Sequence, residues 1–181
     1  MDALGMLEVN SIAAGIEAGD AMLKAAGVTL TLAQPVCSGK FIVMVQGDVA
    51  AVKSSVDAGL SHGGENLVDS LLIPKVHPQV FQAVAGTGEI PEQGAIGVLE
   101  TFSLAACIYA SDAAVKAADI QLLEIRLGRG LGGKSYVTLT GDVSAVSEAV
   151  QVGKSHPQCQ GMITRSAVIP APHPAIRDAL L

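Results

Sequence analysis

The chain has 181 residues, enough for one medium domain or two small ones, and half of these residues are hydrophobic. Its net charge of −6 argues against a nucleic-acid-binding surface, which needs clustered Lys and Arg. The sequence contains no apolar run of about 18 residues and no recognisable signal peptide, so we expect a cytosolic protein without a membrane span. A mean hydropathy of +0.47 then predicts that apolar surface is buried between chains.

An internal repeat organises the sequence. Residues 3–32 align without gaps to residues 95–124, and 15 of these 30 positions are identical. The segment from Ile73 to Pro78 recurs as Ile169 to Pro174, with His77 matched to His173. The offset grows from 92 to 94 and then to 96 residues, so the second copy has two extra residues in each of two loops.

A period above 90 residues indicates a duplicated domain rather than a solenoid. We therefore predict a first domain at residues 1–85, a linker at residues 86–94 that is rich in Gly and Pro, and a second domain at residues 95–181.

Each copy opens with a strand, a helix and a second strand. In the first copy the strand is Ala3–Val9, and Asn10 or Ser11 caps a helix that ends at Gly27. The strand at Val28–Leu32 follows. The residues predicted to form the inward stripe of the helix are Ile12, Ile16 and Leu23.

The copy then continues with a strand at Phe41–Gln46, a helix from Asp48 to Gly59, and a strand at Leu67–Ile73. His77-Pro78 opens a short terminal helix. The predicted inward residues of the second helix are Val49, Val52 and Val56, and those of the second copy are Leu104, Ile108, Val115, Val143, Val146 and Val150. The order β-α-β-β-α-β predicts an α+β fold made of two ferredoxin-like domains.

One loop carries a thiol. Gln34–Lys40 connects two predicted strands, and Pro35 and Gly39 are typical of such a connection. Cys37 is therefore expected on a loop and outside the core. The corresponding connection of the second copy, Leu127–Lys134, has no cysteine.

The second loop matches a nucleotide-binding pattern, but we reject it. Residues 128–135 satisfy GxxxxGK[ST], which requires that a helix follow so that its N-terminus faces the phosphates. Tyr136–Thr140 instead has the pattern of a strand, and Gly133-Lys134 aligns with Gly39-Lys40. The repeat thus indicates a glycine-rich turn between strands.

Several motifs occur in both copies. They are Gly-x-Leu-Glu at Glu8 and Glu100, Asp-Ala-x-x-Lys-Ala at Lys24 and Lys116, and Ile-Pro-x-x-His at the end of each copy. With these motifs the sequence resembles bacterial microcompartment shell proteins with two tandem shell domains. It is especially similar to the tandem-domain shell proteins of propanediol-utilisation compartments, in the Cys-x-Gly-Lys-Phe run at Cys37 and in Gly-Gly-Lys of the second loop.

This resemblance implies a homotrimer that imitates a hexagonal tile, lies in the shell within the cytoplasm and contacts other shell proteins. It implies a [4Fe–4S] cluster at the trimer axis, with Cys37 of each chain as a ligand. An encapsulated or cytosolic redox enzyme is then an expected electron partner. The resemblance also places Lys24 and Lys116 at the edge of the tile.

The residues themselves leave the cofactor open. One cysteine does not hold a cluster, which normally has four ligands, but threefold symmetry brings three loop thiols to one axis. The alternative is a metal-free pore for small molecules, lined by Ser38, Gly39, Gly130, Leu131 and Gly132. An enzyme has no support, because no catalytic constellation recurs near a common loop.

The remaining candidates have structural interpretations. Cys107 aligns with Gly15 inside a helix and is expected in the core. Cys159 lies in the inserted loop His156–Gly161 and has no partner; a structural role is expected, and a reactive thiol is the alternative. His77 and His173 each precede Pro at a helix start, so we expect them to cap helices or to pack at the edge of the domain.

Overall fold

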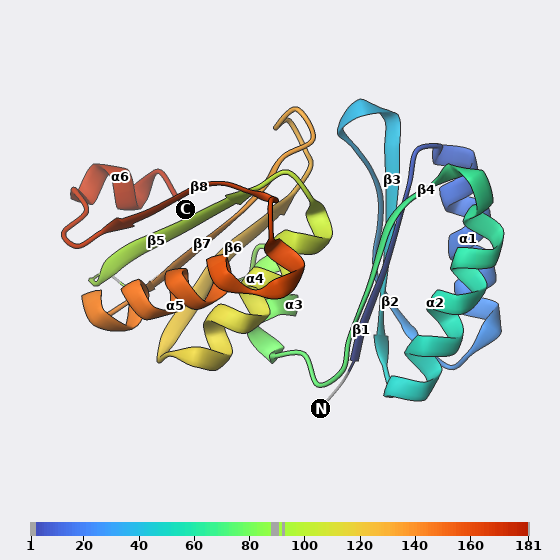
Figure 1. The fold of residues 1–181 in the computed structure, drawn as a ribbon, viewed down its shortest axis with the longest axis horizontal. Coiled ribbons are helices and arrows are strands. Elements are labelled where there is room, and N and C mark those ends of the chain that lie inside the picture. Colours follow the sequence, from blue (N-terminus) through green and yellow to red (C-terminus); the bar gives the residue numbers. More distant parts are fainter. Residues whose placement is uncertain (1–2, 88–90, 92, 181) are drawn as a thin grey trace. The chain divides into compact units, whose positions relative to one another are not determined.

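The computed structural model describes residues 3–87, 91 and 93–180, so part of the predicted linker at residues 86–94 lies outside the described residues. The described chain divides into two compact units (Figure 1). Unit 1 comprises residues 3–76 together with the short segment 129–133, and unit 2 comprises residues 77–128 and 134–180. Within these ranges, every helix is too short or too polar to cross a bilayer.

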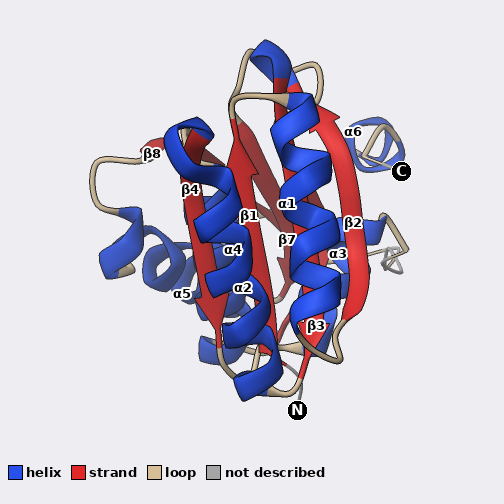
Figure 2. Cartoon of the chain, turned by 90° about the vertical axis from the view of Figure 1, so that its right-hand side faces the viewer, coloured by secondary structure: helices blue, strands red, loops and turns tan. Residues whose placement is uncertain are grey.

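Unit 1 is a four-stranded antiparallel sheet with the order β2-β3-β1-β4. Helices α1 and α2 lie side by side across one face of this sheet (Figure 2). The predicted order β-α-β-β-α-β is confirmed in the elements β1 (Ala3–Val9), α1 (Ile12–Ala25), β2 (Thr29–Val36), β3 (Lys40–Gly47), α2 (Val49–Gly63) and β4 (Leu67–Ile73). Short 3₁₀ turns at Cys37–Gly39 and Gly64–Asn66 complete the unit.

The core of unit 1 lies between the sheet and the two helices. Successive side chains of a strand point to opposite faces, so alternate residues of β1 and β3 meet the helices. The core residues on this face are Ala3, Leu7, Val9, Phe41, Val43 and Val45 from the strands and Ala18, Met22, Val52 and Val56 from the helices. Ser11 is the N-cap of helix α1, and its hydroxyl accepts a hydrogen bond from Ala14 N at 3.3 Å.

The stripe predicted to face inward on α1 is wrong. Ile12, Ile16 and Leu23 are 45%, 58% and 39% exposed, and α1 instead turns its small residues toward the sheet. A Cβ added at Gly15 would lie 2.6 Å from Phe41, so the close approach of this helix to the sheet requires the absence of a side chain. Periodicity detects an apolar face but does not say what covers it.

Helix α2 differs from its prediction in two smaller ways. Val52 and Val56 are buried as expected, whereas Val49 in the first turn is exposed. The helix also continues one turn beyond the predicted end at Gly59, to Gly63. Gly59 lies inside this helix, and its lack of a side chain leaves room for Met22, which occupies the space where a Cβ would lie.

Unit 2 repeats this architecture, with the strand order β6-β7-β5-β8. Its elements are α3 (Pro78–Ala85), β5 (Ala95–Thr101), α4 (Leu104–Ala117), β6 (Ile120–Leu127), β7 (Ser135–Gly141), α5 (Val143–Ser155), a 3₁₀ turn at Pro157–Cys159, β8 (Ile163–Ile169) and α6 (Pro174–Asp178). The inward residues predicted for α4, namely Leu104, Ile108 and Val115, are buried. On α5, Val146 and Val150 are buried but Val143 is exposed.

Helix α3 follows the first repeat in the sequence but packs in unit 2, against β6 and α4. The Gln79 side-chain oxygen accepts a hydrogen bond from Leu122 N on β6 at 2.8 Å. The backbone N–H of His77 donates to Asp112 Oδ1 on α4, also at 2.8 Å. The helix at the end of one repeat therefore covers the edge strand of the next.

Candidate functional site

The loop that carries Cys37 is tighter than the sequence predicts. Strand β2 continues through Pro35 to Val36, which pairs with Lys40 of β3, so only Cys37, Ser38 and Gly39 form the turn. Pro35 is tolerated because β2 is an edge strand. The turn places Ser38 (φ 66°) and Gly39 (φ 72°) in the left-handed region, which is uncommon for a residue with a side chain. The strained turn thus presents Cys37 at the end of the sheet.

The Cys37 thiol is half-buried and faces the tip of the second loop, residues 129–133, which belongs to unit 1. The backbone N–H of Gly130 donates a hydrogen bond to Cys37 Sγ at 3.1 Å. Backbone N–H groups of Leu131 and Gly133, followed by those of Gly130 and Gly132, lower the pKa of Cys37, although desolvation acts in the opposite direction. These donors stabilise the thiolate, which is the form that binds metals.

The second loop connects two strands, β6 and β7, as predicted, and the strand β7 follows directly where a P-loop needs a helix. Its glycines are required by backbone conformation, because Gly128, Gly130, Gly132 and Gly133 all have positive φ. The prediction of a glycine-rich turn between two strands is therefore confirmed. The tip is tethered to β2 by a hydrogen bond from Arg129 Nη1 to Gln34 Oε1 at 3.4 Å.

A buried ion pair lies at the base of the Cys37 loop. Lys40 Nζ pairs with Glu8 of β1, whose side chain is 2% exposed. The equivalent pair in unit 2, Lys134 and Glu100, is longer at 3.4 Å and largely exposed. The repeated Gly-x-Leu-Glu motif indicates both glutamates only as residues of the opening strand. The recurrence of Glu and Lys in both copies is the signal that would have paired them.

The other two cysteines are buried, and all three are free thiols. Burial raises the pKa of Cys107 to about 12, and the prediction that it is a core residue is confirmed. Cys159 is 1% exposed and its Sγ donates to Ala106 O at 3.2 Å. Burial raises its pKa to about 11, which agrees with the expected structural role and contradicts the alternative of a reactive thiol.

The histidines that precede Pro cap helices, in agreement with the sequence. Nδ1 of His77 accepts a hydrogen bond from Gln79 N at 3.3 Å, and Nδ1 of His173 accepts one from Ala175 N at 3.2 Å. The lysines predicted at a tile edge form ion pairs four residues away on their own helices, Lys24 with Asp20 and Lys116 with Asp112, both at 2.5 Å.

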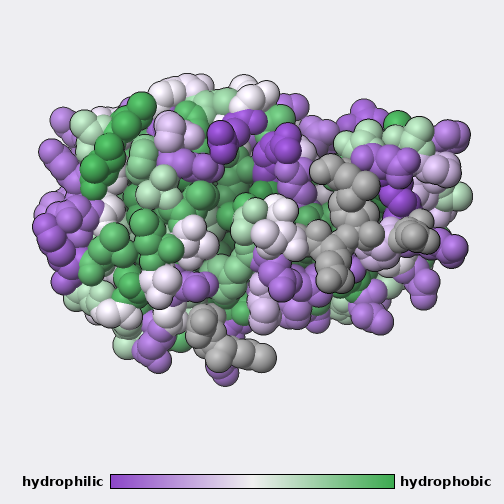
Figure 3. Space-filling model, turned by 180° about the vertical axis from the view of Figure 1, so that it is seen from behind, coloured by the Kyte–Doolittle hydropathy of each residue, from purple (hydrophilic) through white to green (hydrophobic). Residues whose placement is uncertain are grey.

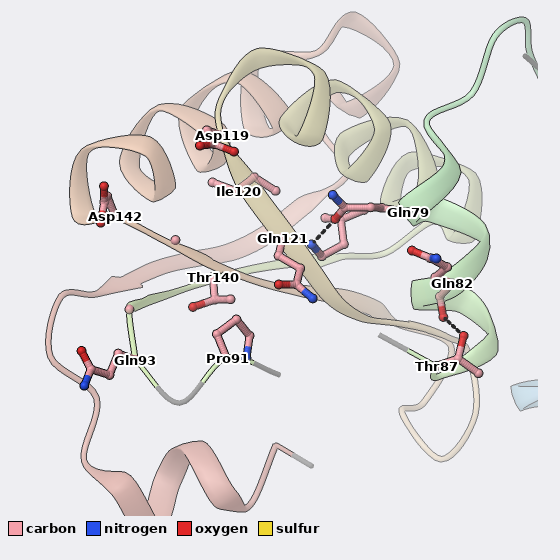
Figure 4. Close-up of a pocket in the computed structure, with 13 residues that line it drawn as sticks. Gln79, Gln82, Thr87, Pro91, Gln93, Asp119, Ile120, Gln121, Thr140 and Asp142 are labelled. Carbon is pink, nitrogen blue, oxygen red and sulfur yellow. Dashed lines mark hydrogen bonds between the residues drawn. The ribbon is translucent and has the colours of Figure 1, made fainter. Parts of the chain in front are cut away.

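Unit 2 contains a polar cavity of about 780 Å³ beside the edge strand β6 (Figure 4). Gln79 and Gln82 of α3 reach into this region from one side, and Thr140 and Asp142 lie on the other. None of the site residues predicted from the sequence lines the cavity. It is therefore separate from the Cys37 loop.

Within the described residues, no group of three or more His, Cys, Asp and Glu side chains is arranged to hold a metal ion. Of the three free cysteines, Cys37 alone is not buried, so each chain presents one accessible thiol. A cluster that needs several thiolates has to take them from several chains.

Comparison with known proteins gives a consistent set of relatives. A family model described as the BMC domain matches residues 3–76 and again residues 95–172. The bacterial microcompartment shell protein PduT of Citrobacter freundii is 45% identical over 171 residues, which cover 94% of this chain and 93% of that protein. The shell protein EutM of Salmonella typhimurium is 46% identical over 80 residues, 42% of this chain and 82% of that protein.

A solved structure has the same fold over nearly the whole chain. The crystal structure of a microcompartment protein from Desulfitobacterium hafniense matches with a TM-score of 0.93 and 49% sequence identity. The match covers 98% of this chain and 99% of that one.

Proposed function

Because the chain belongs to the BMC-domain family of bacterial microcompartment shell proteins, we propose that three copies form a shell tile holding one [4Fe–4S] cluster through their three Cys37 thiolates. As a member of this family the chain is a structural protein rather than an enzyme. The observation that carries the proposal is the position of Cys37, at the tip of a strained loop and facing backbone donors that favour its thiolate.

Unequal burial of equivalent helix residues supports self-assembly. Ile16 of α1 is 58% exposed, whereas its counterpart Ile108 of α4 is fully buried. Apolar surface is visible on the unit 1 side of the molecule, at the left of Figure 3. An exposed apolar face of this kind is typical of a protein–protein interface. The equivalent buried face on α4 indicates that packing against this helix surface is part of the fold.

The contacts of α3 supply a template for the interface. In unit 2 the helix after the first repeat covers edge strand β6, and its His77 N–H donates to Asp112. The equivalents are α6 with His173, edge strand β2 and Asp20, which is 60% exposed. We expect α6 of one copy to cover β2 of the next copy, with the His173 N–H donating to Asp20. Repeating this contact closes a ring of identical interfaces.

The Cys37 site fits an iron–sulfur ligand. Cys37 is accessible, the pKa shift favours the thiolate, and N–H donors are a recurrent feature of iron–sulfur sites. Three thiolates leave one iron for an exogenous ligand. Such a cluster supplies one-electron transfer, and at the axis of a tile it would pass electrons across the shell to an encapsulated or cytosolic redox enzyme. Other shell proteins are the expected neighbours of the tile.

The cluster is tested by purification without oxygen, reduction with dithionite and low-temperature EPR spectroscopy. We expect the signal of a reduced [4Fe–4S] cluster with about four irons per three chains, and its loss in Cys37→Ser. Cys159→Ala, which removes a buried thiol, should keep the iron and the signal. Iron-free unsubstituted protein, or equal iron in Cys37→Ser, would refute the cluster.

The assembly has its own test. Asp20→Ala should weaken the trimer, whereas Asp57→Ala should not, although Asp57 forms a comparable exposed ion pair with Lys53 at 2.6 Å. Sedimentation velocity over a range of protein concentrations measures the difference. Equal dissociation of the two variants would show that Asp20 does not take part in the interface.

A metal-free pore is the second candidate function. The glycine-rich tip of the second loop presents backbone amides, and among the described residues no chain has a complete ligand set of its own. In this case the loops conduct small polar solutes and Cys37 is an ordinary thiol. A stable trimer that contains no iron after anaerobic purification, and that passes solutes when it is reconstituted in a planar bilayer, would favour this function.

A further inference from the structure

We propose that the tip of the second loop, Arg129–Gly133, is a backbone receptor for the Cys37 sulfur that raises the reduction potential of the bound cluster. The inference rests on the proposed cluster and assigns a positioning role to residues of the repeat that lacks a cysteine. The contact that carries it is the hydrogen bond from Gly130 N to Cys37 Sγ at 3.1 Å.

The conformation of the tip is that of an anion-binding backbone. Gly130, Gly132 and Gly133 have φ values of 71°, 61° and 89°, and Arg129 and Leu131 are not among the described residues with positive φ. Alternation of negative and positive φ turns successive N–H groups toward the same side of the chain. The amide of Gly130, the first glycine of this run, is the donor that meets Cys37 Sγ.

Steric packing does not explain these glycines. A Cβ added at Gly130, Gly132 or Gly133 would have no described atom within 4 Å, so a side chain would fit in the available space. The glycines are required only because their backbone conformation is unfavourable for other residues. The three glycines therefore serve to orient the backbone N–H groups of the second loop.

The second loop is also longer than its counterpart in the first repeat. The connection in the first repeat is the three-residue turn Cys37–Gly39, and the second repeat has two additional residues at this point. The tip of this longer loop, residues 129–133, belongs to unit 1 together with Cys37. Arg129 fixes the tip to Gln34 of β2, three residues before Cys37.

The effect on the cluster follows from charge. The reduced cluster carries one more negative charge than the oxidised cluster, so N–H donors to its sulfur ligands stabilise the reduced form more. Losing one such donor should lower the potential and decrease the ratio of reduced to oxidised cluster at a fixed potential. We expect a decrease of about tenfold, which for a one-electron couple is about 59 mV.

The test compares glycines with the same conformation. Gly130→Ala disturbs the donor loop, and Gly161→Ala is the matched control, because Gly161 has φ 72° against 71° at Gly130, and a Cβ at either position would have no described atom within 4 Å. Both variants are prepared without oxygen and checked for trimers and iron. A redox titration followed by EPR should give a lower potential for Gly130→Ala and an unchanged one for Gly161→Ala.

A second variant keeps the test decisive if Gly130→Ala does not retain iron. Arg129→Ala removes the contact with Gln34 but leaves every backbone N–H in place, so it should loosen the tip and lower the potential by a smaller amount. Resonance Raman spectra of the unsubstituted protein should also show Fe–S bands that shift on exchange into D₂O.

The outcomes separate the two proposals. Unsubstituted protein without iron refutes the cluster itself. Iron-loaded variants of the second loop with an unchanged potential, together with Fe–S bands insensitive to D₂O, overturn the role of the second loop and leave the cluster in place.

Discussion

The two repeats fold alike but differ in what surrounds equivalent residues. In unit 2, α4 is buried on nearly every side and contacts α3, whereas in unit 1 the same apolar positions of α1 are exposed. The ion pair of Glu8 and Lys40 is buried, whereas that of Glu100 and Lys134 is largely exposed. We therefore expect equivalent residues of the two repeats to contribute unequally to the free energy of unfolding, and substitutions can measure this difference.

The largest difference is expected at the two glutamates. Glu8→Ala leaves the Lys40 ammonium, which is only 20% exposed, without its carboxylate and should destabilise the fold by about 3–5 kcal/mol. Glu100→Ala removes an exposed pair and should cost less than about 1 kcal/mol. Urea unfolding of both variants measures the two values. Similar losses would show that the burial of the first pair has no energetic importance.

The next largest difference in stability is expected between equivalent apolar residues of α1 and α4. Ile108→Ala opens a cavity at a fully buried site and should destabilise the fold by about 2–5 kcal/mol. Ile16→Ala should change the stability of the isolated chain by less than about 0.5 kcal/mol but weaken its self-association. Thermal unfolding and sedimentation separate these effects. An Ile16→Ala trimer as tight as that of the unsubstituted protein would contradict an interface at α1.

A third contrast concerns packing under the same helix. Gly15 lies against Phe41 in unit 1, and the equivalent residues in unit 2 are Cys107 and Ser135. Gly15→Cys should destabilise unit 1 by about 1–3 kcal/mol through overpacking. Combining it with Phe41→Ser should cost less than the sum of the two single changes, because the two residues compete for one volume. Additive losses in urea unfolding would contradict this explanation.

The smallest effect concerns the thiols. The pKa of Cys37 is lowered by backbone donors, while burial raises those of Cys159 and Cys107 to about 11 and about 12. In the native cluster-free protein at pH 8, iodoacetamide should therefore modify Cys37 first and leave the other two intact, as measured by peptide mass spectrometry.

The same shifts give a pH dependence of stability. Because the folded-state pKa values of Cys107 and Cys159 exceed the unfolded value of 9.0, stability should fall as the pH rises above about 9. In the iodoacetamide experiment, modification of Cys159 at the same rate as Cys37 would contradict the burial of Cys159.

The duplication, the element order and the strand–strand turn at the second loop were predictable from the sequence. These follow from local signals, since strand alternation, helix caps and glycine turns depend on neighbours along the chain. The bounds of β1 at Ala3–Val9 and of β4 at Leu67–Ile73 agree with the prediction for the same reason. The core role of Cys107 followed from its alignment with Gly15.

Three features are visible only in the folded chain: the buried face of α1, the packing of α3, and the contact of the second loop with Cys37. The stripe at Ile16 has the same period whether a sheet or another chain covers it, and Gly15 is selected by contact with Phe41, a residue distant in sequence. The contact of Gly130 with Cys37 joins residues 93 positions apart through a backbone N–H, which every residue except Pro carries. The glycines of the second loop indicate its backbone conformation, but they do not indicate which distant atom the N–H group meets.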